Sequence, residues 1–237
     1  MKKRRIVTRP YNFLTSLHAY ELPCFPAVPI AFAASNFLSF FNMKNDRRTC
    51  SWPTRDPLLT AYHDREWGVP LHNDRKLFEF LVLEGFQAGL SWLTVLRKRA
   101  NFRKAFDGFD FNKVARYDRR KIDSLVKDSG IIRNRLKIEG AVANARAFIK
   151  VRKEFGTFDK YIWGFTGSNP VNNGFRSLNE LPARTGLSDL ISRDLKKRGF
   201  KFVGSTIVYA HMQATGMVND HIKDCYRYKE IVEKFKK

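Results

Sequence analysis

Cysteine is scarce in this sequence, whose 237 residues contain only Cys24, Cys50 and Cys225. An odd and sparse set argues against the disulfide framework of a small secreted domain, and it leaves thiols available as metal ligands. Long apolar runs are missing too. No stretch of 18 residues is free of both charged residues and helix breakers, so we expect no transmembrane helix.

Acidic residues are also few, with 23 against 44 basic residues, and the formal net charge is +21. A surface this basic attracts polyanions, of which nucleic acid is the most common. A solubilising cationic surface and weak binding to acidic membranes are the alternatives. The charge favours a nucleic-acid-binding protein but does not establish one.

Alternation of apolar and polar residues with a period of two is almost absent, so we expect no β-sheet. Apolar residues instead recur at helical spacing between glycine, asparagine, aspartate and serine residues. We predict an all-α fold with helices in the following segments: from Asn73, interrupted at Gly85 and Gly89; from Asp118 to Gly130; 133–155, closed by Gly156; from Ser188 to Gly199; and 201–215.

Residues 1–42 differ from the rest of the chain. They open with four basic residues and continue through a Phe-rich apolar stretch that carries three prolines. The prolines would break the helix of a signal peptide, and Met43 leads directly into the globular pattern. We therefore predict that 1–42 is an extension, disordered or not part of the native protein, and that the domain spans 43–237. Organelle targeting by the extension is the alternative if the source is a eukaryote.

Two pairs of candidate metal ligands lie near the two ends of this domain, Cys50 with His63 and His221 with Cys225. Zinc prefers thiolate and imidazole ligands in a tetrahedron, and a His and a Cys four residues apart share one helix face. Four protein ligands would leave no position for water, so the site would be structural. Because the pairs are far apart in the sequence, two buried thiols and two hydrogen-bonded histidines are the alternative.

Residues 129–137 combine a helix end, a tight apolar turn and a new helix with cations at alternate positions. The turn contains Gly130, and the cations are Arg133, Arg135 and Lys137. Turn amides and helix N-termini bind backbone phosphates in this way in a helix-hairpin-helix. An ordinary helical hairpin with a solvated basic face is the alternative.

Aromatic residues surround one carboxylate in the first part of the domain. The aromatic residues are Trp52, Tyr62, Trp67 and Trp92, and the carboxylate is Glu84, which follows a Leu-Val-Leu run. Such a group suits a flipped, cationic, alkylated purine, because ring faces attract the charge and a carboxylate accepts from the exocyclic amine. An aromatic core in which Glu84 pairs with a Lys or Arg is equally compatible with the sequence.

Taken together, these segments resemble the DNA-3-methyladenine glycosylase I family of the helix-hairpin-helix superfamily. The resemblance extends over about Cys50 to Tyr226, nearly the whole domain. The matching segments occur in family order and spacing, and they are 50–52, 61–70, 83–92, 130–135, 196–204 and 218–221. One position departs from the pattern, since Leu59 stands where some relatives carry an aromatic residue.

The resemblance implies a role for each candidate residue. Cys50, His63, His221 and Cys225 would bind one structural zinc ion per chain. Glu84 would be the catalytic residue and read the adenine edge, and Tyr62 and Trp92 would stack on the base. Trp52 and Trp67 would line the pocket. The hairpin residues, which are Gly130, Arg133, Arg135 and Lys137, would contact the DNA backbone.

The resemblance also implies an enzyme of base excision repair that removes 3-methyladenine from double-stranded DNA by base flipping and leaves an abasic site. The family lacks the aspartate that wider superfamily members place after the hairpin; Asp159 is the nearest candidate here and is ambiguous. Because the resemblance implies no Schiff-base lysine, we expect a monofunctional glycosylase. We also expect the protein to be monomeric, cytoplasmic and nucleoid-associated. Among possible partners we expect DNA and not a membrane. A non-catalytic, zinc-stapled DNA-binding module is the alternative, and the preference against 3-methylguanine stays open.

Overall fold

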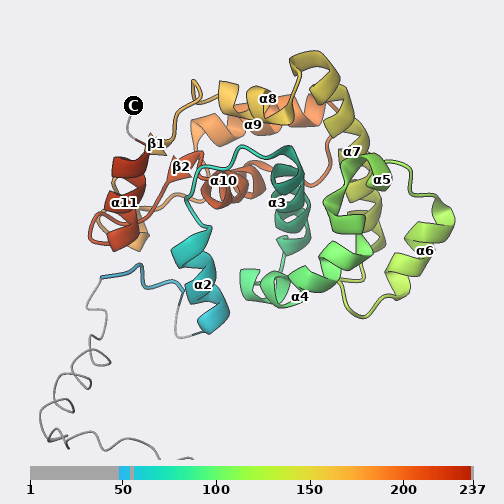
Figure 1. Cartoon of the computed structure of the whole chain (residues 1–237), viewed down its shortest axis with the longest axis horizontal. Helices are drawn as coiled ribbons and strands as arrows, with labels where there is room; N and C mark the ends of the chain where they lie inside the picture. Colours follow the sequence, from blue (N-terminus) through green and yellow to red (C-terminus); the bar gives the residue numbers. More distant parts are fainter. Residues whose placement is uncertain (1–47, 54–55, 236–237) are drawn as a thin grey trace, which may run out of the picture. The chain divides into compact units, whose positions relative to one another are not determined.

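The computed structural model describes residues 48–53 and 56–235, so the extension 1–42 and the boundary at Met43 lie outside the described residues. The described chain is mostly helical, as predicted (Figure 1). Its α-helices are α2 (Pro57–Arg65), α3 (Asp74–Gln87), α4 (Trp92–Ala105), α5 (Phe111–Val114), α6 (Arg119–Lys127), α7 (Arg135–Phe155), α8 (Phe158–Gly164), α9 (Gly186–Lys197), α10 (Ser205–Ala214) and α11 (Tyr226–Lys234). Two short 3-10 helices, η2 (Asp107–Phe109) and η3 (Leu178–Glu180), lie between them.

Side-chain caps explain where many of these helices begin. In each case a short polar side chain just before the helix accepts the backbone N–H three residues later, which satisfies one of the unpaired donors of the first turn. The predicted helix starts at Asn73 and Asp118 are confirmed, since each of these residues caps the helix that follows it. The N-caps of this kind are Asn73, Ser91, Asp118, Asn134, Thr157 and Thr185.

Helix α3 lies in the middle of the fold, where it packs against α4, α7, α8 and α10 (Figure 1). All its residues from Leu77 to Phe86 are buried. The predicted interruption at Gly85 is wrong, because the helix continues to Gln87. A Cβ at Gly85 would lie 3.3 Å from the Cβ of Phe202, so this glycine allows close packing inside an intact helix. Gly89, with a φ of 78°, lies after the helix end.

A small sheet corrects the expectation that the chain has none. Strand β1 (Val171–Asn172) pairs in parallel with β2 (Val218–Asn219), with Val171 opposite Val218 and Asn172 opposite Asn219. The side chain of Asn219 also donates to that of Asn172 at 3.1 Å. Strands of two residues are too short to carry a period-two pattern, which explains why the sequence gives no sign of them.

Several predicted helix ends differ from those observed by a few residues, among them the start of α7, which begins at Arg135 after its N-cap Asn134. Helix α6 ends at Lys127, so Gly130 lies in the following loop and does not end the helix. Helix α9 begins at Gly186, because Thr185 and Ser188 cap it reciprocally. Helix α10 begins only at Ser205, since the preceding loop contains Phe202 at a φ of 54°.

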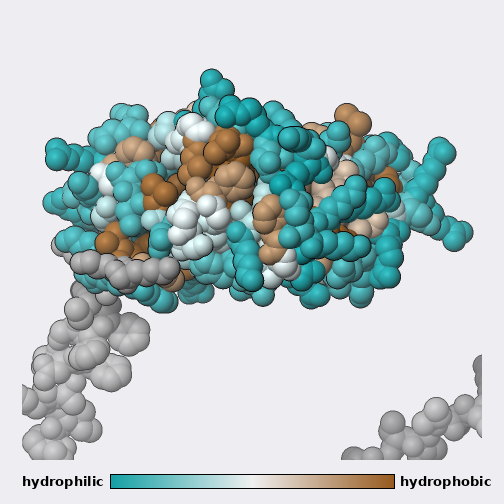
Figure 2. Space-filling model, turned by 90° about the horizontal axis from the view of Figure 1, so that it is seen from above, coloured by the Kyte–Doolittle hydropathy of each residue, from teal (hydrophilic) through white to brown (hydrophobic). Residues whose placement is uncertain are grey.

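The described surface agrees with the basic, polar composition. Figure 2 shows a face that is mostly hydrophilic, with a hydrophobic area near its middle and smaller ones around it. Within the described residues, every helix is too short or too polar to cross a bilayer.

Candidate metal centre and base-binding pocket

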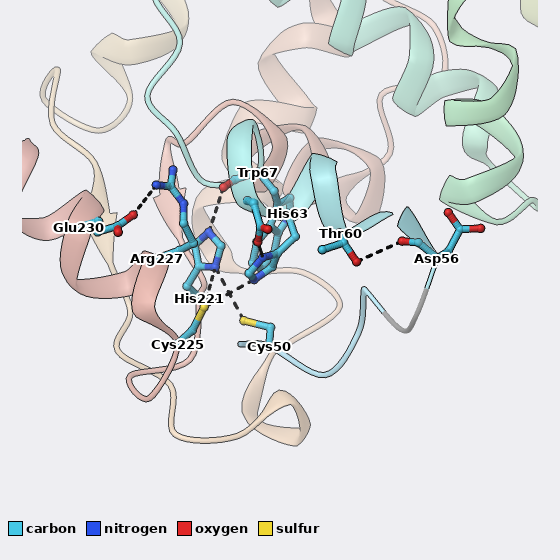
Figure 3. Close-up of polar contacts among 10 residues, drawn as sticks. Cys50, Asp56, Thr60, His63, Trp67, His221, Cys225, Arg227 and Glu230 are labelled. Atoms are coloured by element: carbon cyan, nitrogen blue, oxygen red, sulfur yellow. Dashed lines mark hydrogen bonds and ion pairs between the residues drawn. The ribbon is translucent and has the colours of Figure 1, made fainter. Parts of the chain in front are cut away.

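Two thiols and two imidazoles from the two ends of the domain meet in one buried cluster. Cys50 precedes α2, His63 lies in α2, His221 follows β2, and Cys225 is the N-cap of α11. All four side chains are buried, and their ligand atoms lie within 4.8 Å of one another (Figure 3). The fold therefore brings together the complete set of residues that the sequence suggested as metal ligands.

The spacing of the donor atoms fits a tetrahedral zinc ion. A tetrahedron with Zn–S bonds of about 2.3 Å and Zn–N bonds of about 2.05 Å places sulfur and nitrogen about 3.6 Å apart. Cys50 Sγ lies 3.7 Å from His221 Nδ1, and Cys225 Sγ lies 3.5 Å from both His221 Nδ1 and His63 Nε2. The donor set is also one that zinc prefers, so these residues could hold the ion.

The outer ring nitrogens of both histidines have partners that orient them. His63 Nδ1 lies 2.7 Å from an oxygen of Asp64, and His221 Nε2 lies 2.9 Å from the carbonyl oxygen of Trp67. Such contacts direct the remaining nitrogen toward a metal ion. The neighbouring Cys50 thiol, followed by the imidazoles of His221 and His63, lowers the pKa of the Cys225 thiol, which favours a metal-binding thiolate there.

Next to this cluster is a pocket of about 310 Å³ that contains all five residues of the predicted aromatic and carboxylate group. These residues come from the loop before α2, from α2 and the turn after it, from α3 and from the start of α4. The remaining wall comes from distant segments. The full lining is Trp52, Tyr62, Trp67, Glu84, Gln87, Trp92, Leu178, Leu181, Ala210 and Gln213.

Aromatic rings form a continuous wall between the pocket and the metal-ligand cluster. The rings of Tyr62 and Trp92 are tilted, with centroids 5.3 Å apart, and those of Trp52 and Trp67 meet edge to face at 5.0 Å. Trp67 also lies edge to face against His221 at 4.6 Å. Because the same ring lines the pocket and contacts a metal ligand, order in the cluster supports the shape of the pocket.

Glu84 is buried in the pocket with 3% of its surface exposed. Among the described residues it has neither a hydrogen-bond donor nor an ion-pair partner, so the pairing with a Lys or Arg that the sequence allowed is not formed. Burial alone raises the pKa of its carboxyl group to about 8. An unpaired buried carboxyl group is costly unless a ligand supplies its partner.

Two hydrogen-bond donors in the pocket also lack partners. The indole N–H groups of Trp52 and Trp92 are buried without an acceptor in the described part of the chain. Tyr62 keeps its proton, because burial, followed by the nearby Glu84 and Glu66, raises its phenol pKa. The pocket thus offers ring faces, neutral donors and one carboxyl group to a small aromatic ligand.

In the hairpin that follows α6, two of the residues expected to contact DNA form hydrogen bonds within the protein. The backbone N–H of Gly130 donates to Asp128 Oδ1 at 2.7 Å, and its carbonyl accepts from Asn101. Lys137 is buried, and its ammonium group donates to the carbonyls of Phe86 and Ala88 at 2.9 and 2.6 Å.

The expected phosphate contact therefore does not fit Lys137, because the last carbonyls of α3 lack partners within their helix and take up its charge. Arg135 is half-exposed and pairs with Asp123 at 2.7 Å. Arg133 is exposed and forms no ion pair with any described residue. Of the three predicted cations, it is the one presented freely to solvent.

Asp159, the ambiguous catalytic candidate, is not near the pocket. Its carboxylate lies 2.8 Å from His72 Nδ1, and its own N–H donates to Asp74. The sequence reading missed five pocket residues. Gln213 and Ala210 lie within a predicted helix, where nothing local marks them. Leu178 begins the short 3-10 helix η3 and Leu181 follows it, and Gln87 follows Glu84 by less than one turn.

Comparison with known proteins identifies relatives that share this architecture. Residues 52–228 match the family model for methyladenine glycosylase. The chain is 49% identical to DNA-3-methyladenine glycosylase 1 of Escherichia coli (strain K12) over 179 residues, which cover 76% of this chain and 96% of that protein. It is 44% identical to the DNA-3-methyladenine glycosylase of Haemophilus influenzae, over 74% of this chain and 95% of that protein.

Solved structures give the same result. A crystal structure of 3-methyladenine DNA glycosylase I is 47% identical with a TM-score of 0.74, and the alignment covers 76% of this chain and 98% of that one. The structure that describes 3-methyladenine recognition by the Staphylococcus aureus enzyme is 34% identical with a TM-score of 0.74, covering 76% and 96%.

Proposed function

Because this chain belongs to the methyladenine glycosylase family and is a DNA repair glycosylase, we propose that it hydrolyses the N-glycosidic bond of 3-methyladenine in alkylated double-stranded DNA. The base flips out of the duplex into the aromatic pocket, and the reaction leaves an abasic site. The observation that carries the proposal is the unpaired, buried carboxyl group of Glu84 among aromatic rings.

The pocket suits the charge of this base. A 3-methylated adenine nucleotide is cationic, so its faces are attracted to the rings of Tyr62 and Trp92, and each desolvated contact contributes about 2 kcal/mol. Glu84, once ionised, stabilises the same charge and accepts from the exocyclic amine. Trp52 and Trp67 exclude water from the other side of the pocket.

The chemistry needs little acid catalysis. The positive charge of the base weakens the bond to the sugar, and as this bond breaks its electron pair passes to the base, which leaves as a neutral molecule. Water adds to the oxocarbenium-like carbon of the sugar and releases its proton to the solvent. Among the pocket residues no lysine is available to form a Schiff base with the sugar. We therefore expect a monofunctional glycosylase without strand-cleaving activity.

Cys50, His63, His221 and Cys225 are proposed to hold one structural zinc ion. When bound, a zinc ion would cross-link the two ends of the domain and would have no open coordination site. The fit of the sulfur and nitrogen spacing supports this assignment. Elemental analysis should return about one zinc per chain, and Cys225→Ser should lose it together with thermal stability. A metal-free protein of unchanged melting temperature would contradict the assignment.

The hairpin and Arg133 are proposed to contact the DNA backbone, with Arg135 contributing after its pair with Asp123 opens. A zinc-stapled DNA-binding module without chemistry is the second candidate, supported by the net charge of +21 alone. It gives no role to an unpaired carboxyl group in a pocket.

Base release separates the two candidates. Purified protein is incubated with methylated duplex DNA, and the released bases are separated by chromatography. We expect free 3-methyladenine, together with abasic sites that break only after alkali treatment. Binding of the DNA without base release would favour the binding module, and breaks without alkali would contradict the monofunctional mechanism.

The extension is proposed to be dispensable. The family match begins at residue 52, and the Escherichia coli relative is covered almost completely by 76% of this chain. A chain that begins at Met43 should equal the full chain in zinc content, melting temperature and base release, and both should sediment as monomers. Unfolding of the shorter chain would move the domain boundary upstream.

A further inference from the structure

Gln213 is a pocket residue whose amide group has a defined orientation. It lies on α10, one turn after Tyr209, and both side chains reach the same carboxylate oxygen of Asp220. Tyr209 donates its hydroxyl to Asp220 Oδ2 at 2.6 Å, and Gln213 donates its Nε2 to the same atom at 2.8 Å. The other oxygen of Asp220 accepts from Asn173 at 2.6 Å.

This network prevents the amide of Gln213 from turning over. Asp220 is 1% exposed, and as a carboxylate it accepts hydrogen bonds and offers none. A reversed amide would place the carbonyl oxygen of Gln213 against Oδ2 and leave a buried acceptor pair without a proton, which is costly. The amino end is therefore directed at Asp220, which does not line the pocket.

The carbonyl oxygen of Gln213 is the polar atom that remains for the pocket. No described residue donates a hydrogen bond to it. Glu84 lines the same pocket, and α3, which carries it, packs against α10. The two helices thus present two oxygen-bearing side chains to one ligand.

We propose that the carbonyl oxygen of Gln213, oriented by Asp220, accepts a hydrogen bond from the exocyclic amine of the flipped base and selects 3-methyladenine against 3-methylguanine. The inference rests on the proposed function. Adenine carries an amine at position 6, whereas guanine carries an oxygen there. A fixed acceptor pairs with the amine and repels the oxygen.

Glu84 cannot make this distinction by itself. With a carboxyl pKa raised by burial to about 8, it is able to hold a proton and donate to a guanine oxygen, or to lose it and accept from an adenine amine. Gln213 has no such choice, because Asp220 occupies its amino group. A site built around a fixed hydrogen bond discriminates strongly against a ligand that cannot form it.

The test compares Gln213→Met with Tyr209→Phe. Each variant removes one hydrogen bond to Asp220 Oδ2, but only the first removes an acceptor from the pocket. Both are incubated with DNA methylated to contain 3-methyladenine and 3-methylguanine, and the initial release rate of each base is measured. We expect Gln213→Met to lower the ratio of the two rates roughly tenfold, and Tyr209→Phe to leave the ratio as in the wild type.

Two results would overturn the inference: a ratio unchanged in a folded, active Gln213→Met protein, or an equal loss of the ratio in Tyr209→Phe. If Gln213→Met does not fold, Asp220→Asn provides the same test, because an asparagine can donate to the carbonyl of Gln213 and permit the reversed amide. Wild-type protein that releases no 3-methyladenine would instead refute the proposed function, so the two failures are distinguishable.

Discussion

Glu79 and Glu84 lie little more than one turn apart on α3, and both are buried, but the fold surrounds them differently. Glu79 accepts from the guanidinium groups of Arg99 and Arg103 at 2.6 and 3.0 Å. Glu84 has no partner among the described residues, and its pKa is raised to about 8. Both glutamates are buried, but the neighbours of Glu79 make it part of a structural ion pair, whereas Glu84 is left without a partner and a ligand can supply the missing charge.

The cations of the hairpin show the same contrast. Lys137 is buried against the last carbonyls of α3, whereas Arg133 is exposed and unpaired within the described chain. Lys137 stabilises the helix that carries Glu84, and Arg133 remains available to a polyanion. In both pairs, the residue without an internal partner is the candidate for binding.

The largest effect is expected for Glu84. Glu84→Gln should lower the rate of 3-methyladenine release roughly a hundredfold, because it removes the Coulomb attraction to the cationic base and a charged hydrogen bond. Single-turnover kinetics on methylated DNA measures this rate, and circular dichroism checks that the variant is folded. Near-wild-type release by a folded variant would remove Glu84 from the proposed mechanism.

Glu79→Gln should act on stability instead. The change leaves Arg99 with one carboxylate partner fewer in a nearly buried position, so the free energy of unfolding should fall by about 3 kcal/mol. Chemical denaturation measures the loss. Below the new melting temperature the folded fraction should still release the base, and a specific loss of release without destabilisation would erase the distinction between the two glutamates.

The pH dependence of stability sharpens the contrast. The pKa of Glu84 in the folded protein is about 8, above the ordinary 4.5, so the folded state binds its proton more tightly than the unfolded state. This contribution is complete below about pH 4.5 and is lost as pH rises toward 8, by a few kcal/mol. Glu84→Gln lacks the loss, so its stability relative to the wild type should grow between pH 5 and pH 8. A pH-independent difference would mean that Glu84 titrates normally.

The smallest effects are expected in the hairpin. Arg133→Gln should weaken binding to all duplex sequences alike and lower the salt dependence of binding by about one unit of slope. Lys137→Met should lower the melting temperature and leave the slope unchanged, since its charge is used internally. Binding measured by fluorescence anisotropy over a range of salt concentrations separates the two, and identical slopes for wild type and Arg133→Gln would return Arg133 to an ordinary solvated surface.

The sequence by itself determined those features that depend on neighbouring residues or on residue type. N-caps such as Asn73 and Asp118 act on N–H groups three residues away, so helix starts can be predicted locally. The residue types of Cys50 and His63 also mark them as potential metal ligands without tertiary information, once a second His and Cys are present in the sequence.

Only the tertiary structure decided which groups meet and which are left without a partner. Gly85 lies inside α3, where Phe202 packs closely on it, and Lys137 is internal because the end of α3 lies beside it. Gln213 has a fixed direction because Asp220, on a separate segment, accepts its amino group. Hydrogen bonds and ion pairs between different segments produce no repeating pattern in the sequence. Their energy depends on interatomic distances that only the folded structure establishes.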